Sequence, residues 1–331
     1  MMTRRSYFPL TLVYFPLTLA VVTLTTHGVW LNLATAAGYE LRDVPEQHMD
    51  VLQDGKLLGR YMYALDLSSS ERRHETYKPF LHVFDPDGDA PITKGPGGKY
   101  THHRGVFRGW NRLTLAGKTY DTWHMKGVVQ KHLRFIANEA DQKHAVIRSQ
   151  ISYQTDDGNV LLQETRSMEF LPAPAPAYAM FDVSSTVEAV AGAINLNGDP
   201  EHAGLQFRPA NDVVGSKTVY YFPGVEIDPR KDRDLVWVAE SFVIDDDQQY
   251  TVIYLNHPEN RDGAIFSAYR PYGRFGAWFA GEVPADGEQT TRVRFVVLKG
   301  EFPSAEFAQQ QYNAFAGTSD PTPDLTVRKA K

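Results

Sequence analysis

Hydrophobic and polar residues alternate with a period near two along most of the chain after residue 40. Two of the alternating segments turn back at an Asp-Gly pair, a dipeptide that favours the positive φ angles of a tight hairpin turn. One predicted hairpin covers residues 51–63 around Asp54-Gly55, and a longer one covers residues 144–170 around Asp157-Gly158. The pattern therefore predicts antiparallel strands.

Further segments share this alternation, are rich in β-branched and aromatic residues, and end at Gly, Pro or Asp. No amphipathic helical segment separates them, so the pattern does not favour βαβ units. It predicts one all-β domain over residues 37–317, a large antiparallel β-sandwich of two packed sheets. The additional strands are predicted at residues 80–84, 133–138, 179–187, 205–208, 218–222, 235–244, 250–255, 264–269, 276–280 and 290–298.

One short helix is predicted near the C-terminus, over residues 305–315. Ser304 can cap its first turn, and three apolar residues would form one face. We expect this helix to pack over one end of the sandwich. Residues 318–331 contain Pro321 and Pro323 and end in basic residues, and they are predicted to form a disordered tail.

Residues 1–36 have the pattern of a secretory signal peptide. A pair of arginines at positions 4 and 5 precedes a largely apolar segment, residues 8–33, and Ala-Thr-Ala at 34–36 has the small-x-small pattern of a signal-peptidase site. We expect cleavage before Ala37 and a periplasmic or secreted protein. A retained N-terminal anchor is the alternative, and the sequence leaves open whether the export route is the general secretory or the twin-arginine one.

Composition narrows the functional classes. The 331 residues carry a formal net charge of −6 without a clustered basic segment, so no nucleic-acid partner is expected. The chain has no cysteine, which excludes disulfides, thiol catalysis and cysteine-ligated metals. No apolar run of about 18 residues follows the signal peptide, so we expect no stable membrane insertion after its cleavage.

The longest segment without a strand pattern, residues 85–109, contains the run His102-His103-Arg104-Gly105. Long ordered loops usually have a functional role, and an imidazole can act as general acid, general base or metal ligand near neutral pH. We therefore predict that His103 or His102 is a base or metal ligand, with His124 as its catalytic partner. Neighbouring cations and aromatic rings would bind substrate oxygens and stack on a sugar ring: Arg104, Arg108, Trp110 and Trp123.

Polar residues at later strand ends could join the same site. Glu164 and Arg166 lie two apart on the return strand of the second hairpin and so project to one face, where a surface ion pair is the alternative. His202 and Arg208 flank an apolar strand, and His257 ends another. We predict that Glu164 and Arg208 bind substrate and that His257 takes part in catalysis, because strand ends are common positions for binding sites.

Known motifs are absent from the chain. No Ser-His-Asp order, phosphate loop, dinucleotide fingerprint or zinc-protease motif occurs, so no nucleotide cofactor is expected. The segment Asp85-Pro-Asp-Gly-Asp89 resembles the start of a calcium loop but lacks the downstream Glu. Acid/base chemistry, metal-assisted chemistry with an unidentified divalent metal, and ligand binding without catalysis are all left open.

In these same motifs the chain resembles the bacterial PmoA-family proteins. The family's name refers to a methane oxygenase subunit, which is an integral membrane protein, and this chain lacks such spans. The sugar oxidoreductases and carbohydrate-degrading proteins encoded beside the family imply a small-molecule or carbohydrate ligand. The matching motifs are His-His-Arg-Gly at 102–105, Asp121-x-Trp123, Glu164-x-Arg166, Gly204 to Arg208, His257-Pro258 and Tyr-Gly-x-Phe-Gly at 272–276.

The sequence thus predicts an exported enzyme that acts on a carbohydrate or sugar derivative by histidine acid/base or metal-assisted chemistry, as a lyase, hydrolase or epimerase. A non-catalytic carbohydrate-binding or cell-envelope module is the alternative, and a structural sandwich without a ligand is a third. The several imidazoles favour the enzyme, because sugar binding rarely requires them. We expect His103 and His124 to lie with Arg208 and His257 around one cavity.

Overall fold

The first large sheet carries the candidate site. The computed structural model describes residues 38–245 and 247–331, and every strand pairing in this sheet is antiparallel. Its eight strands lie in the order β1 (Tyr39–Val44), β2 (His48–Gln53), β3 (Lys56–Met62), β4 (Phe80–Val83), β5 (Val106–Trp110), β13 (Ala203–Phe207), β18 (Phe275–Trp278) and β17 (Ile265–Phe266).

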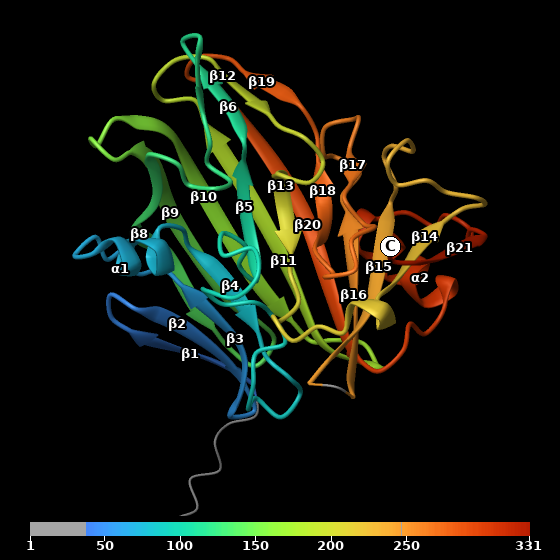
Figure 1. The fold of residues 1–331 in the computed structure, drawn as a ribbon. Helices are drawn as coiled ribbons and strands as arrows, with labels where there is room; N and C mark the ends of the chain where they lie inside the picture. The colour runs from blue at the N-terminus through green and yellow to red at the C-terminus, as the bar shows by residue number, and fades with distance from the viewer. Residues whose placement is uncertain (1–37, 246) are drawn as a thin grey trace, which may run out of the picture. The chain divides into compact units, whose positions relative to one another are not determined.

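The second large sheet packs face to face with the first (Figure 1). Its nine strands lie in the order β21 (Leu325–Lys329), β14 (Val219–Pro223), β15 (Trp237–Ile244), β16 (Gln248–Asn256), β20 (Glu288–Lys299), β11 (Ala177–Glu188), β10 (Val160–Leu171), β9 (Ala145–Thr155) and β8 (Val128–Ala140). A small third sheet has the order β19 (Gly281–Val283), β12 (Ile194–Asn197), β6 (Arg112–Leu115) and β7 (Lys118–Tyr120).

The main core lies between the two large sheets, because each strand turns every second side chain toward the opposite sheet. Phe170, Phe181 and Phe295 come from three neighbouring strands of the second sheet and stack at ring-centroid distances of 5.2 and 5.1 Å. Phe207 of the first sheet lies 6.3 Å from Phe295 across this interior. The predicted antiparallel β-sandwich is confirmed.

Both predicted hairpins are present. Asp54 and Gly55 join β2 to β3 with φ angles of 52° and 81°, and Gly158 has a φ of 89° in the turn between β9 and β10. Glycine adopts such angles without steric cost, so the Asp-Gly pairs were reliable signals of these turns.

Helix α2 (Ala305–Ala316) is the predicted C-terminal helix. The Ser304 side chain accepts a hydrogen bond from the Phe307 amide at 3.1 Å, and Gly317 ends the helix with a φ of 69°. The helix covers the outer face of the second sheet beside β15 and β16, not one end of the sandwich (Figure 1). Two further helical elements were not predicted: helix α1 (Ser70–Thr76) and a single 3₁₀ turn, η1 (Gly215–Lys217). Several strands were also missed, among them β5, which begins at Val106 inside the segment 85–109 that was expected to have no strand.

Replacing Ser304 by Ala is expected to lower the free energy of unfolding by about 1 kcal/mol, because the first turn of α2 loses its side-chain cap. Urea denaturation followed by circular dichroism measures this change. Ser216→Ala, at an exposed position in η1, is the matched control and should leave stability within about 0.5 kcal/mol. Equal stabilities for the two variants would contradict a stabilising cap.

The predicted disordered tail is wrong in part. Residues 325–329 form β21, which pairs with β14 from Val219↔Lys329 to Pro223↔Leu325. Without this pairing β14 would be the edge of the second sheet, and its amide and carbonyl groups would lack strand partners. Pro321 and Pro323 precede the strand and do not interrupt the pairing.

The predicted signal peptide lies outside the described residues. Neither helix in the described part of the chain has the length and apolar composition needed to span a bilayer.

Candidate active site

The candidate site lies on the outer face of the first sheet. Val106 and Phe207 belong to the core between the sheets, so their strand neighbours Phe107 and Gln206 project to the opposite face. Phe107 packs there against Trp123, with ring centroids 4.8 Å apart. The loops beside β4, β5 and β13 carry the polar residues that gather over this surface.

Four histidines from three separate segments meet there, and we call His102, His103, His124 and His202 the histidine cluster. The His102 ring lies 4.4 Å from both the His103 and the His124 rings, measured between centroids. His124 lies 5.2 Å from His202. The structure therefore brings together the three histidines of the predicted loop region and adds a fourth.

Two members of the cluster are oriented by carboxylates. His124 Nδ1 lies 2.8 Å from Asp121 Oδ2, and His202 Nδ1 lies 2.8 Å from Asp199 Oδ1. Asn111 Nδ2 donates to the other Asp199 oxygen at 2.7 Å. An imidazole that donates its Nδ1–H to a carboxylate leaves Nε2 as a hydrogen-bond acceptor and proton acceptor. Both side chains are therefore arranged as general bases.

The carboxylates are held in their ionised form. Burial alone would raise the pKa of Asp121, but hydrogen bonds from the side chain and backbone of His124 lower it below its ordinary value. Burial opposes ionisation of Asp199 in the same way, and hydrogen bonds from Asn111 and His202 lower its pKa. Each aspartate can therefore stabilise an imidazolium that forms beside it.

Burial, reinforced by nearby cations, lowers the pKa of the two inner histidines. Burial and then the nearby Lys78 ammonium lower the pKa of His102 to about 2. Burial and then Arg274 lower the pKa of His103 well below its ordinary value. Lys78 is itself only 1% exposed and donates to the Trp123 carbonyl at 2.6 Å. Burial and then Arg104 also lower the pKa of Lys78 itself well below its ordinary value.

Three predicted substrate-binding residues lie in the wrong place for that role. Arg108 donates across the interior to Ser185 O at 3.2 Å and Thr291 Oγ1 at 3.1 Å, and Trp110 belongs to a buried core cluster. Glu164 is fully buried and pairs with Arg166 at 2.7 Å. All three side chains point between the sheets, because the strand alternation places them on the same face as the core residues.

Arg104 and Arg208 adjoin the site but bind backbone. Arg104 donates to Thr101 O at 2.6 Å and to His74 O at 2.6 Å. Arg208 donates to Pro209 O at 2.9 Å and to the Tyr272 carbonyl. Both guanidinium groups are buried, with at most 1% of either residue exposed. They position the loops of the site and do not present a free guanidinium to substrate.

His257 does not join the cluster, so the prediction that it lies with His103 and His124 is wrong. Its ring contacts Phe315 of α2 edge-on at 4.9 Å, on the outer face of the second sheet. Trp123, by contrast, lies directly beneath the site, 5.9 Å from the His103 ring and 6.1 Å from the His202 ring. It is fully buried, so it supports the histidines and offers no exposed face for stacking.

The spacing Asp-x-x-His could have identified the second carboxylate–histidine pair. Asp121 and His124 have this spacing, and so do Asp199 and His202. The same spacing occurs once more at Asp141 and His144, in the exposed turn between β8 and β9. In the turns at Asp121 and Asp141 the aspartate side chain accepts a hydrogen bond from the histidine backbone amide, so the motif by itself indicates a local turn. Only the position of each turn in the fold shows which of them belongs to the candidate site.

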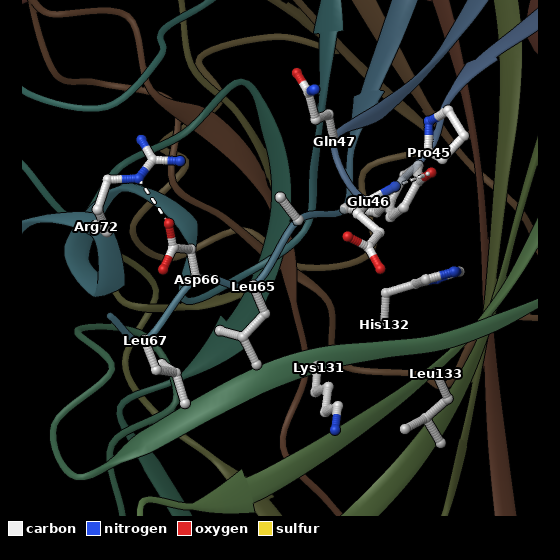
Figure 2. Close-up of a pocket in the computed structure, with 12 residues that line it drawn as sticks. Pro45, Glu46, Gln47, Leu65, Asp66, Leu67, Arg72, Lys131, His132 and Leu133 are labelled. Atoms are coloured by element: carbon white, nitrogen blue, oxygen red, sulfur yellow. Dashed lines mark hydrogen bonds and ion pairs between the residues drawn. The ribbon is translucent and has the colours of Figure 1, made fainter. Parts of the chain in front are cut away.

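A separate hollow of about 1050 Å³ is the pocket in Figure 2. It lies beside the segments around residues 45–47, 63–67 and 131–133, and contains no member of the histidine cluster. Two of its polar side chains are already engaged. Arg72 Nε donates to Asp66 within the lining at 3.0 Å (Figure 2), and His132 Nδ1 lies 2.7 Å from Ser149 Oγ, outside the lining.

A metal site was one of the open alternatives. Within residues 38–245 and 247–331, no group of three or more histidine, aspartate and glutamate side chains is arranged to hold a metal ion.

The fold and site define an all-β sandwich with a histidine cluster on one outer face. A family model described as DUF6807, a family of unknown function, matches residues 48–313. Since this range covers most of the sequence, the chain belongs to that family. The resemblance to PmoA-family proteins stays a prediction. A search of curated protein sequences found no match.

Two solved structures illustrate how distant the structural similarity is. A mutant of the heparan sulfate lyase HepC from Pedobacter heparinus is 13% identical with a TM-score of 0.38, and the match covers 81% of this chain and 36% of the lyase chain. The Slr1438 protein from Synechocystis sp. PCC 6803 is 11% identical with a TM-score of 0.34, covering 80% of this chain and 96% of that one. No functional statement follows from similarity at this level.

Proposed function

We propose that this protein is an exported enzyme that acts on a carbohydrate or sugar derivative by histidine acid/base catalysis. One observation carries the proposal: two imidazoles, His124 and His202, have ring centroids 5.2 Å apart, and the Nδ1 of each is bound to a half-buried aspartate. A structural histidine needs no such pair of oriented neighbours, whereas proton transfer into and out of one substrate does.

The chemistry follows from the free Nε2 atoms. A neutral imidazole accepts a substrate proton at Nε2 and becomes an imidazolium, which its aspartate stabilises. The neighbouring imidazole, if protonated, donates a proton to the atom that receives the electron pair. The net proton count is unchanged, and the same arrangement serves isomerisation or bond cleavage. His102, held neutral and 4.4 Å from His124, orients that ring.

An exposed aromatic surface supports a carbohydrate ligand. Tyr100 is 37% exposed and packs against Tyr272 with ring centroids 4.5 Å apart, and Tyr272 lies 5.9 Å from His103. Aromatic faces at the surface of a polar site are suited to the C–H faces of sugar rings. The same surface would serve a carbohydrate-binding module, so turnover decides between the two functions.

The test is hydrogen exchange in D₂O. The protein is incubated with mono- and oligosaccharides, neutral and acidic, and NMR follows deuterium incorporation at carbon and the appearance of new species. For the substrate found, His124→Asn and His202→Asn should each reduce turnover by about 100-fold or more, because Asn keeps the bond to aspartate but lacks Nε2. His257→Asn, on the other sheet, is the control and should be fully active. Binding without turnover in the wild type would indicate the binding module.

A further inference from the structure

Arg274 is a buried cation without a counter-ion. It directly precedes β18 and is 0% exposed. Its Nη1 donates to Gln206 Oε1 at 3.1 Å, while Nε and Nη2 have no hydrogen-bond partner. No ion pair within 4.0 Å joins it to any described carboxylate. A buried, unpaired charge destabilises a folded protein by several kcal/mol, so such a residue is retained at a cost in stability.

The free edge of Arg274 is the edge that this chain uses to bind carboxylates. Nε and Nη2 project from the same side of the guanidinium group, as a planar fork that matches two carboxylate oxygens. Four arginines of the described chain bind an aspartate or glutamate through these two atoms: Arg60 with Asp50, Arg166 with Glu164, Arg294 with Asp182, and Arg270 with a single oxygen of Glu201.

Nearby carboxylates do not satisfy this edge. Glu201 is engaged by Arg270, at 2.5 and 3.0 Å, and by the Tyr269 hydroxyl at 3.0 Å. Glu240 lies on β15 of the second large sheet and is fully buried. Neither of its carboxyl oxygens makes a hydrogen bond, and no described ion pair within 4.0 Å joins its carboxyl group to Arg274. Burial raises the pKa of Glu240 well above its ordinary value, against the opposing effects of Arg208 and Arg274.

Other unpartnered nitrogen atoms adjoin Arg274. Its Cζ lies 5.9 Å from the Trp123 ring, whose indole N–H is buried without a partner. His103 Nδ1 is also buried without a partner, and its ring lies 5.9 Å from Trp123. A cationic fork beside an indole donor and an imidazole favours a ligand with negatively charged oxygens.

From this arrangement we propose that the ligand of the histidine cluster is a sugar acid whose carboxylate binds Nε and Nη2 of Arg274, with the Trp123 indole as a further donor. The inference rests on the proposed function for the location of the sugar, and it adds the class of substrate. It also assigns a role to the rings above Arg274. The Tyr272 ring lies 6.0 Å from the guanidinium carbon and Tyr100 packs against Tyr272. Under this proposal the aromatic pair must move aside so that the carboxylate can enter.

Binding measurements test the substrate class. D-glucuronate and D-galacturonate are titrated into the full chain by calorimetry, beside the neutral sugars D-glucose and D-galactose and the anionic D-glucose 6-sulfate. At least one uronate should bind more than about 10-fold more tightly than its neutral counterpart, and Arg274→Met and Arg274→Lys should each remove that advantage, since Lys lacks the fork. Arg270→Met, at a neighbouring arginine already paired with Glu201, is the matched control and should keep the preference for the uronate.

A second measurement needs no ligand. Because Arg274 is buried without a counter-ion, Arg274→Met should raise the urea midpoint of the protein alone, whereas a structural ion pair with Glu240 would make the same variant less stable. A lowered midpoint, or uronate binding no tighter than that of neutral sugars, overturns the proposal. If D-glucose 6-sulfate binds as tightly as the uronates, the site is a general anion site and not a carboxylate site, and the proposal is overturned as well. His124→Asn should abolish turnover yet keep uronate binding, so failure of the acid/base proposal is seen separately.

Discussion

Replacing Glu164 by Ala is expected to lower the free energy of unfolding by about 3–5 kcal/mol, because it breaks a buried ion pair from one side. Glu164 is fully buried and accepts hydrogen bonds from Tyr153 at 2.8 Å and Arg166 at 2.7 Å. Burial alone would raise its pKa, but Arg166 and then Arg108 lower it to about 2, so it is ionised at neutral pH. The variant leaves two guanidinium groups in the interior without this carboxylate. Urea denaturation at pH 7 measures the loss.

Glu169→Ala on the same strand provides the comparison. Its side chain is 39% exposed and pairs with His144 at the surface, so its removal should change stability by about 0.5–1 kcal/mol or less. A Glu164→Ala protein with wild-type stability and reduced ligand binding would instead restore Glu164 as a substrate-binding residue.

Acidification from pH 7 to pH 5 is expected to destabilise the protein by about 2 kcal/mol for each histidine whose pKa the fold lowers well below 6. Burial, reinforced by Arg60, lowers the pKa of His82 to about 4, and burial lowers the pKa of His132 to about 4. Burial and Lys78 lower the pKa of His102 to about 2. The unfolded chain takes up protons below the ordinary histidine pKa of about 6.5, but the folded protein does not. Stability is therefore complete above that pH and falls as the pH drops toward 4.

Glu240 acts in the opposite direction, because its raised pKa lets the folded protein hold a proton that the unfolded chain releases. Urea midpoints at pH 7 and pH 5 are therefore compared in the wild type and in Glu240→Gln. The variant should lose more stability than the wild type between pH 7 and pH 5. His82→Asn and His132→Asn should each reduce the loss by about 2 kcal/mol. His144→Asn is the control, since Glu169 raises the pKa of that exposed histidine. Identical pH dependence in all four variants would show that these histidines are not kept neutral by the fold.

Part of the candidate site was accessible from the sequence. The run at residues 102–105 and the later His124 were correctly expected to converge, because histidine, arginine and aromatic residues were concentrated in one long loop and the hairpin that follows it. His202 was noted as a neighbour of the predicted strand but was not assigned a role. Arg274 was included only as the variable residue of the Tyr-Gly-x-Phe-Gly turn and was given no role, and Lys78 was not singled out, since a single buried cation in or beside a strand has no sequence pattern of its own.

The same limit explains the misassigned residues. Whether Arg108 or Glu164 faces solvent or the interior depends on which side of its strand faces the opposite sheet. Side-chain alternation predicts that each strand has two faces. It does not predict which charged residues lie on the face toward the core, where they are stable only if they find a bonding partner. Charged residues are rarely buried unless paired, and here the partners of Arg108 are 77 and 183 residues away in sequence.

Local interactions determined what the sequence predicted by itself: the strands, the two Asp-Gly hairpins and the capped C-terminal helix. Each depends on residues a few positions apart, through backbone φ preference, side-chain alternation or a cap hydrogen bond. Tertiary structure alone decided the pairing of β21 with β14, the separation of His257 from the other histidines, and the meeting of His124 with His202. These depend on which strands become neighbours, and that order follows from burying both sheet faces of the whole chain at once.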